Sequence, residues 1–257
     1  MDVILVSPRN PLNIGAAARA MANFGFPRLS IVAPFAVNWM EAKSAVGAPD
    51  LLREAKVYET LAEAVAHCTL VLGTGSIDRR RPVQMVLGLP DAATQVRAAL
   101  AQSEAGEKPS HIALVFGSEK HGLTSDDLSW CHALIVIDTC DAQPSMNLGQ
   151  AVAVSLYEIS RTSNSPNGST PSTPGQLNHE KISNSQSPDS EQLDRLASLI
   201  EQVMEAVNYS TRGMRSANGE ALRVLLRRLM PNEADLRRMM GLFRRILWQL
   251  GHRGNKV

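Results

Sequence analysis

Short apolar runs alternate with helical patterns over the first 160 residues or so, and this alternation constrains the fold more than any other feature. Runs such as IALVF and ALIVI are apolar at every position, as strands covered on both faces of a parallel sheet should be. The sequence therefore predicts an α/β domain in which helices cover both faces of a parallel sheet. We expect strands at 2–7, 29–34, 69–74, 111–117 and 133–139, and helices at 13–24, 41–55, 60–67, 90–104 and 147–161.

The chain divides into three parts by composition. Residues 1–162 form the predicted α/β domain, and residues 163–190 are so poor in large apolar side chains that we expect a flexible linker. Residues 191–257 predict a small all-α domain. Its helices are expected at 190–208, 218–230 and 233–250, with Asn218 and Asn232 as N-caps and Gly251 after the last helix.

The net charge of +1 hides an asymmetry between these parts. Residues 1–190 hold 14 basic and 18 acidic side chains, whereas residues 191–257 hold 12 and 7. A basic surface that faces a partner is therefore expected in the C-terminal part. The arginine pairs 227/228, 237/238 and 244/245 lie either on solvated helix faces or on a patch that follows RNA phosphates.

The sequence gives no sign of export or of a membrane span. The first residues lack the basic and apolar regions of a signal peptide, and no run approaches the roughly 20 apolar residues of a transmembrane helix. Cys68, Cys131 and Cys140 form no CxxC pair, which fits a reducing compartment. We expect a cytoplasmic protein with buried structural thiols and no metal site.

The segment NPLNIGAAARAM at 10–21 follows the first predicted strand. It predicts a helix that Asn13 caps and Gly25 ends. At 100° per residue, Arg19 lies opposite the apolar stripe of this helix and so does not face its core. Such an arginine is most often a solvated surface residue, although the small residues before it would let a nucleotide approach closely.

The segment LVFGSEKHGL at 114–123 predicts a buried strand that runs into a polar turn. Its glycines, Gly117 and Gly122, offer the backbone freedom that close approach to a ligand requires. Glu119 falls beyond the carboxyl end of the strand, where ligands bind in α/β sheets. Taken alone, it would be a surface carboxylate.

The segment PSMNLGQAVAVSLYE at 144–158 predicts a helix. Ser145 is a possible cap at its start, and Ser145 and Asn147 are both residue types that favour helix starts for local reasons. Without other information these two residues would be assigned to capping alone.

The segment LVLGTGSIDRRRP at 70–82 places a Gly-x-Gly turn after a strand, as a dinucleotide-binding fold would. That fingerprint needs a third glycine and a helix directly after the turn, and both are missing here. A nicotinamide-dependent oxidoreductase is therefore disfavoured. The three arginines at 79–81 lie either on a solvated loop or against phosphate groups.

The order and spacing of these blocks resemble the SpoU (TrmH-like) family of SPOUT RNA methyltransferases. N-x-x-N-I-G-x-x-A-R is similar to motif 1, V-F-G-x-E-x-x-G-L to motif 2, and S-M-N to motif 3, which usually has S-L-N. The 70–82 segment and the C-terminal helices resemble the TrmJ-type branch of tRNA methyltransferases. The resemblance implies a SPOUT-type trefoil-knotted domain, a homodimer, and S-adenosylmethionine as methyl donor.

The resemblance also implies roles for individual residues. The arginine at the position of Arg19 is catalytic, the asparagine at that of Asn13 helps to orient it, and Arg19 of one chain serves the donor pocket of the other. Glu119, Ser145 and Asn147 complete the expected catalytic set. The donor pocket is expected to involve Thr74, Gly75, Ser76, Leu114, Gly117, Ile137, Pro144, Ser145, Met146 and Leu148.

The expected activity is methyl transfer to a ribose 2′-hydroxyl of tRNA, at cytidine or uridine 32 of the anticodon loop. Because the guanidinium of Arg19 holds its proton above pH 12, we expect it to position the hydroxyl and stabilise developing negative charge rather than accept a proton. Two alternatives stay open, an rRNA 2′-O-methyltransferase of the same family and an RNA-binding SPOUT relative without catalysis.

Overall fold

The computed structural model describes residues 1–35, 39–41, 47–75, 82–104, 110–161, 187–209 and 214–253. These residues contain a seven-stranded sheet in the order β3-β2-β1-β6-β4-β7-β5, and all neighbouring strands are parallel. The strands are β1 (Asp2–Val6), β2 (Leu29–Val32), β3 (Lys56–Tyr58), β4 (Leu70–Thr74), β5 (Met85–Gly88), β6 (Ile112–Phe116) and β7 (Ala133–Val136).

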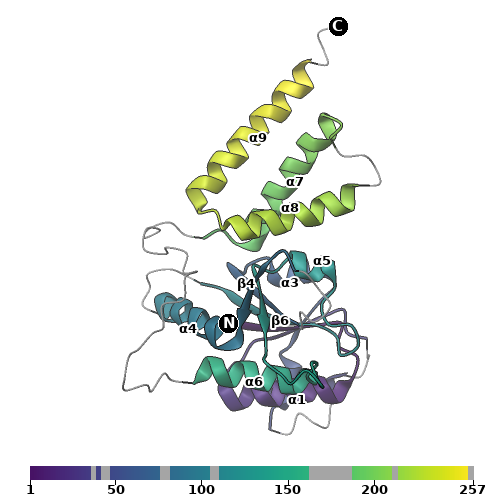
Figure 1. The fold of residues 1–257 in the computed structure, drawn as a ribbon, viewed down its shortest axis with the longest axis vertical. Coiled ribbons are helices and arrows are strands. Elements are labelled where there is room, and N and C mark those ends of the chain that lie inside the picture. Colours follow the sequence, from purple (N-terminus) through teal and green to yellow (C-terminus); the bar gives the residue numbers. More distant parts are fainter. Residues whose placement is uncertain are drawn as a thin grey trace.

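Helices cover both faces of the sheet, as expected (Figure 1). Successive residues of β1 point to opposite sides, so Val3 and Leu5 join one apolar core while Ile4 and Val6 join the other. The first core is covered by α1 (Pro11–Phe24), α2 (Pro49–Arg53), α4 (Leu89–Glu104) and α6 (Leu148–Ser160), with the short helix η1 (Trp39–Glu41). The second is covered by α3 (Leu61–Val65) and α5 (Ser125–Ser129).

One predicted helix cap is wrong, and at α6 the structure decides between the two capping residues expected. Asn10, not Asn13, caps α1, because its side chain accepts a hydrogen bond from the Leu12 N–H. Asn147, not Ser145, caps α6. The predicted end of α1 is confirmed, since Gly25 adopts the left-handed conformation with a φ of 76°.

The strands β3 and β5 escaped prediction, and both lie at edges of the sheet. β3 has three residues and β5 has four, and much of their surface is exposed. An edge strand has a neighbouring strand on one side only, so its other side is exposed to solvent. Its sequence therefore needs no continuous apolar run. The short helix α5 was missed as well.

The C-terminal part forms three helices, as predicted. They are α7 (Ser190–Ala206), α8 (Arg215–Leu229) and α9 (Glu233–Arg253), and they share a small apolar core. Asn232 caps α9, as expected, by accepting from the Asp235 N–H. Asn218 and Gly251 lie inside α8 and α9, so these two predicted boundaries are wrong. The predicted linker falls mostly outside the described residues. No helix within the described ranges is long and apolar enough to cross a membrane.

The three C-terminal helices pack on the side of the sheet that carries α3 and α5, opposite α1 and α6 (Figure 1). Backbone contacts fix the start of α7, because Ser190 donates to the Cys68 carbonyl and Glu191 donates to the Ala66 carbonyl. Arg223 on α8 bonds Ser129 and Asp126 on α5. The C-terminal helices are therefore joined to the α/β domain by specific polar contacts as well as by the chain.

Arg227 is the central residue of this contact and is only 1% exposed. Its Nε donates to the Trp130 carbonyl at 3.0 Å, and its guanidinium lies 4.9 Å from the centre of the Trp130 ring. Burial lowers the pKa of Arg227 to about 10, so the side chain stays charged at neutral pH. Arg227 therefore faces neither solvent nor RNA, in contrast to both interpretations of the 227/228 pair.

Arg227→Ala should lower the free energy of unfolding by about 2–3 kcal/mol, because it leaves a cavity and an unpaired Trp130 carbonyl between the two parts of the chain. Urea denaturation would measure the change. The neighbouring Arg228 is exposed, so Arg228→Ala is the matched control and should stay within about 0.5 kcal/mol of the parent protein. Equal effects of the two substitutions would contradict the assignment.

Candidate active site

The carboxyl ends of β1, β6, β4 and β7 lie side by side at one edge of the sheet, because these strands are parallel neighbours. This arrangement brings together segments that the sequence analysis assigned to the donor pocket. Thr74 ends β4, and its hydroxyl donates to the Val115 carbonyl of β6 at 3.1 Å. Gly75 donates to the Ile135 carbonyl of β7 at 3.1 Å. Gly117 and Ile137 directly follow β6 and β7.

Glu119 joins this edge to the start of α1. One carboxylate oxygen accepts from the Arg9 N–H at 2.9 Å. The other accepts from the Asn10 N–H at 3.0 Å and from the Asn13 side-chain amide at 2.9 Å. Glu119 thus holds the turn between β1 and α1 against the turn after β6.

Asn13 continues the hydrogen-bond network to the third block of the sequence. Its Oδ1 accepts from the Asn147 side chain at 2.9 Å. Asn147 in turn accepts the Gly149 and Gln150 N–H groups at the start of α6, at 2.9 and 3.4 Å. Residues from all three blocks are therefore joined by direct hydrogen bonds.

The same contacts decide the charge state of Glu119. Partial burial on its own would raise the pKa of this carboxyl group, but the hydrogen bonds from the Asn13 side chain and from the Asn10 and Arg9 backbone outweigh it and lower the pKa. Glu119 is therefore ionised at neutral pH and fully used as an acceptor. Its hydrogen bonds make it an anchor for the turn between β1 and α1.

Gly117 is needed for a reason other than the one expected. A Cβ at this position would lie 2.1 Å from the carbonyl carbon of Gly122, because the turn folds back on itself through a bond from the Gly122 N–H to the Ser118 carbonyl. The close approach at Gly117 is thus made by the protein's own backbone. Gly122 has a φ of 64°, which suits glycine.

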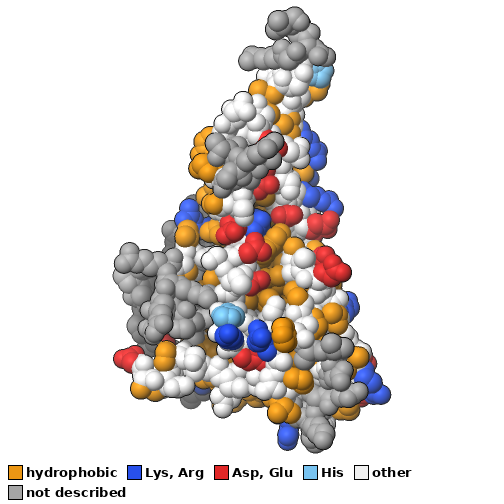
Figure 2. All heavy atoms as spheres, turned by 90° about the vertical axis from the view of Figure 1, so that its right-hand side faces the viewer, with side chains coloured by type: hydrophobic (Ala, Val, Ile, Leu, Met, Phe, Trp, Pro, Cys, Tyr) orange, Lys and Arg blue, Asp and Glu red, His pale blue; other side chains and the backbone are white. Residues whose placement is uncertain are grey.

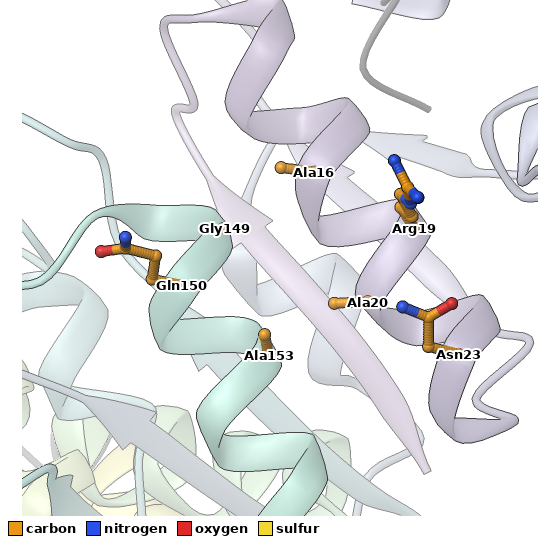
Figure 3. A pocket seen from close by; sticks show the side chains of 7 residues that line it. All are labelled: Ala16, Arg19, Ala20, Asn23, Gly149, Gln150 and Ala153. Carbon is orange, nitrogen blue, oxygen red and sulfur yellow. The ribbon is translucent and has the colours of Figure 1, made fainter. Parts of the chain in front are cut away.

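Arg19 lies on the exposed side of α1 and lines an open hollow of about 430 Å³ between α1 and α6 (Figure 3). The two helices approach closely there, since a Cβ on Gly149 would lie 2.7 Å from that of Ala16. Among the described residues no hydrogen bond joins Arg19 to Asn13. The expected orienting contact between these two residues is therefore absent from the described part of a single chain. The hollow is lined by Ala16, Arg19, Ala20, Asn23, Gly149, Gln150 and Ala153.

The other expected donor-pocket residues differ in their exposure. Pro144 and Ser145 are exposed and Met146 is half-buried, so this segment can contact a ligand directly. Leu114 lies within β6, between β1 and β4, and like Leu148 it is buried in the apolar core. Leu114 and Leu148 can therefore support a pocket only from beneath it. Ser76 and the arginines 79–81 lie outside the described residues.

The cysteines were expected to be buried, which is confirmed for Cys68 and Cys131 but wrong for Cys140. Burial raises the pKa of Cys68 and of Cys131 to about 12. His67 and Cys68 follow α3, with ring nitrogen and sulfur 3.7 Å apart and Asp2 nearby. Both oxygens of Asp2 already have partners, Arg28 and His67.

No site role was predicted for Arg9 and Asn10, which contact Glu119, or for Asn23 and Gln150, which line the hollow, although Asn10 begins motif 1. A partial signal existed for the first two. Pro8 and Pro11 flank them, and a segment restricted at both ends is suited to hold a fixed turn.

The parallel α/β sheet with helices on both faces, which a solved TrmJ structure shares, defines the class, a SPOUT-type methyltransferase fold, and its strand ends carry the Glu119–Asn13–Asn147 network. Residues 1–157 match the family model described as the SpoU rRNA Methylase family. The chain belongs to this family.

Relatives that carry the name of an activity agree with the family. The chain is 31% identical over 99% of its length to the tRNA (cytidine/uridine-2′-O-)-methyltransferase TrmJ of Escherichia coli (strain K12), covering 97% of that protein. It is 39% identical over 61% of its length to the tRNA (cytidine/uridine/adenosine-2′-O-)-methyltransferase TrmJ of Pseudomonas aeruginosa, where the match spans 59% of the relative. The crystal structure of TrmJ from Z. mobilis ZM4 superposes with a TM-score of 0.78 at 27% identity, covering 95% of this chain and 98% of that one.

Glu119→Gln should lower the free energy of unfolding by about 1 kcal/mol at neutral pH, because an exposed but charge-assisted anchor is lost. Since folding lowers the pKa of Glu119, its contribution is present above the ordinary carboxyl range and is lost as pH falls through the folded-state pKa. Urea unfolding of both proteins between pH 7 and pH 3 would show the difference shrink. A difference that grows toward acid would contradict this role.

Proposed function

We propose that this protein transfers a methyl group from S-adenosylmethionine to a ribose 2′-hydroxyl of tRNA, at the pyrimidine nucleotide 32 of the anticodon loop. The observation that carries the proposal is the hydrogen-bonded convergence of Asn13, Glu119 and Asn147 beside the hollow that holds Arg19. The activity of the tRNA methyltransferase to which the chain is similar over nearly its full length supports tRNA as the substrate. Such an activity would act in the cytosol, the location expected from the sequence.

The edge of the sheet suits a donor of this chemistry. S-adenosylmethionine combines a flat purine, a ribose and a zwitterionic amino acid, so its site needs apolar surface and polar backbone together. Ile137 and Met146 are half-buried apolar residues, and the backbone from 138 to 147, between β7 and α6, forms neither helix nor strand. When bound there, the donor would supply an electrophilic methyl group and need no metal.

Arg19 is proposed to position the ribose hydroxyl. A guanidinium offers N–H donors and no acceptor, so Arg19 cannot accept the proton of the hydroxyl. It can instead donate hydrogen bonds to the oxygen and stabilise the negative charge that develops there. Asn23 and Gln150 line the same hollow and can help to hold the ribose.

The active unit is proposed to be a homodimer whose copies meet through α1 and α6. Small residues line the hollow between these helices, and large apolar side chains beside it are exposed: Leu12 by 54%, Tyr157 by 52% and Val154 by 37%. A second copy would cover these groups. It would also supply contacts for Arg19, which has no salt bridge among the described residues.

The C-terminal helices are proposed to hold tRNA through their exposed arginines. Arg237 and Arg238 on α9 are exposed, and neither pairs with a carboxylate in the described ranges. Unpaired basic side chains along one helix can follow a phosphate backbone. Arg227 is not part of this surface because it is buried against Trp130.

A ribosomal RNA substrate is the second candidate, since the family model is described by that activity. Labelled methyl transfer to purified tRNA and to rRNA separates the two substrates. Transfer to rRNA alone would replace the tRNA proposal, and transfer to neither would favour an RNA-binding protein without catalysis.

Arg19→Lys should slow single-turnover methyl transfer about 100-fold, because an ammonium group cannot reproduce the planar pair of donors. Affinity for S-adenosylmethionine, measured by calorimetry, should not change. Arg53→Lys is the matched control, since Arg53 is exposed and pairs only with the adjacent Asp50. A near-normal rate for Arg19→Lys would refute the proposed role.

Mixing two inactive variants tests the shared site. Arg19→Ala removes the group that acts on the partner's pocket, and Ser145→Trp fills the donor pocket at an exposed position. When the two are mixed and allowed to exchange subunits, each mixed dimer regains one intact site, so activity should recover to about a quarter of the parent value. No recovery after proven exchange would contradict a site shared between chains.

A further inference from the structure

The turns after β1 and β2 have the same unusual conformation. β1 and β2 pair in register up to Val6 and Val32, and the next residue of each strand, Ser7 and Ala33, adopts a left-handed conformation with φ values of 47° and 44°. This conformation is unfavourable for residues that carry a Cβ. A proline follows each of them, so the chain reads Ser-Pro-Arg in one turn and Ala-Pro-Phe in the other.

These matched turns place Arg9 over Phe35. The Phe35 N–H donates to the Pro8 carbonyl at 3.2 Å, and the Arg9 guanidinium carbon lies 4.3 Å from the centre of the Phe35 ring. The Arg9 backbone is fixed from the other side by Glu119. The pair is thus preorganised by hydrogen bonds on both turns and not by contacts of its own side chains alone.

The pair is open to solvent, although burial of an aromatic ring and pairing of a guanidinium with an anion are both favourable. Phe35 is 68% exposed, and Arg9 is exposed and has no salt bridge within the ranges that the structure describes. Figure 2, which faces the right-hand side of Figure 1, shows basic side chains and a histidine close together on that face of the molecule. The backbone that carries Arg9 also binds the Glu119 of the candidate active site.

We propose that Arg9 and Phe35 form a stacking platform for an unpaired nucleotide next to the nucleotide that is methylated. The base stacks on the flat guanidinium, which Phe35 supports from behind, and the N–H edge of Arg9 binds the adjoining phosphate. This inference rests on the proposed function and makes the two residues positioning residues for the RNA. The strained turns hold the platform at a fixed distance from Asn13 and Arg19.

Fluorescence of an anticodon stem-loop RNA with 2-aminopurine at each loop position in turn tests the platform. The parent protein should quench the probe strongly at one position beside the target nucleotide. Phe35→Ala should abolish that quenching and weaken RNA binding about 5- to 100-fold, while Phe35→Tyr should retain both. Phe35→Leu keeps apolar bulk without a ring and should behave like Phe35→Ala.

Arg9→Gln should weaken binding and reduce the dependence of log affinity on log salt by about 0.7, as the loss of one phosphate contact does for single-stranded RNA. Because the two side chains act as a unit, the double variant should lose less than the product of the single effects. Val57→Ala, which trims another exposed apolar side chain, and Arg53→Gln, which removes an already paired charge, should leave binding unchanged.

The outcomes separate this inference from the proposed function. If the parent protein methylates tRNA and Phe35→Ala binds the RNA as tightly as the parent does, the platform is refuted and the activity stands. If Phe35→Ala turns a dimer into a monomer in sedimentation, the pair is a contact between copies and the inference is overturned. If the parent transfers no methyl group to tRNA, the proposed function fails, whatever the fluorescence shows.

Discussion

The arrangement of the candidate site depends on one carboxylate. Glu119 accepts three hydrogen bonds from the segment that joins β1 to α1, and these bonds connect positions more than 100 residues apart in the chain. Asn13 transmits the constraint to Asn147, which starts α6. The positions of both helices that line the Arg19 hollow therefore follow from the ionised state of Glu119. An aliphatic side chain there would leave three donors without this acceptor, which gives a structural reason for an acidic residue at this position.

The sheet was predictable because β6 and β7 are apolar at every position, as strands of a parallel sheet that is covered on both faces should be. The helix starts were less predictable, since each block offers two capping residues two or three positions apart. At α1, Asn13 cannot serve as the cap because its side chain is committed to Glu119 and Asn147, and Asn10 takes that role instead. The local pattern permits both choices, and a partner distant in sequence decides between them.

The same limit applies to the functional residues. The motifs predicted that Asn13, Glu119 and Asn147 belong to one site, and the structure joins them by hydrogen bonds. The Arg9–Phe35 pair was not predictable, because it depends on the register between β1 and β2 and on left-handed conformations at residues other than glycine. For Arg227 the sequence pattern indicated exposure, whereas the structure buries the side chain. A pair of arginines on a helix indicates a solvated face, yet Trp130 offers a ring and a carbonyl that stabilise a buried guanidinium.

The position of the C-terminal helices limits how RNA can reach the site. They occupy the α3 and α5 side of the sheet, so the α1 and α6 side stays available for a second copy (Figure 1). In a dimer formed through α1 and α6, the two sets of C-terminal helices lie on the outer sides and the strand ends lie between them and the interface. An RNA held by the exposed arginines of α9 must then cross the edge of the sheet to reach Arg19. Arg9 and Phe35 lie at that edge, which is where an unpaired loop nucleotide would need support before its neighbour enters the hollow.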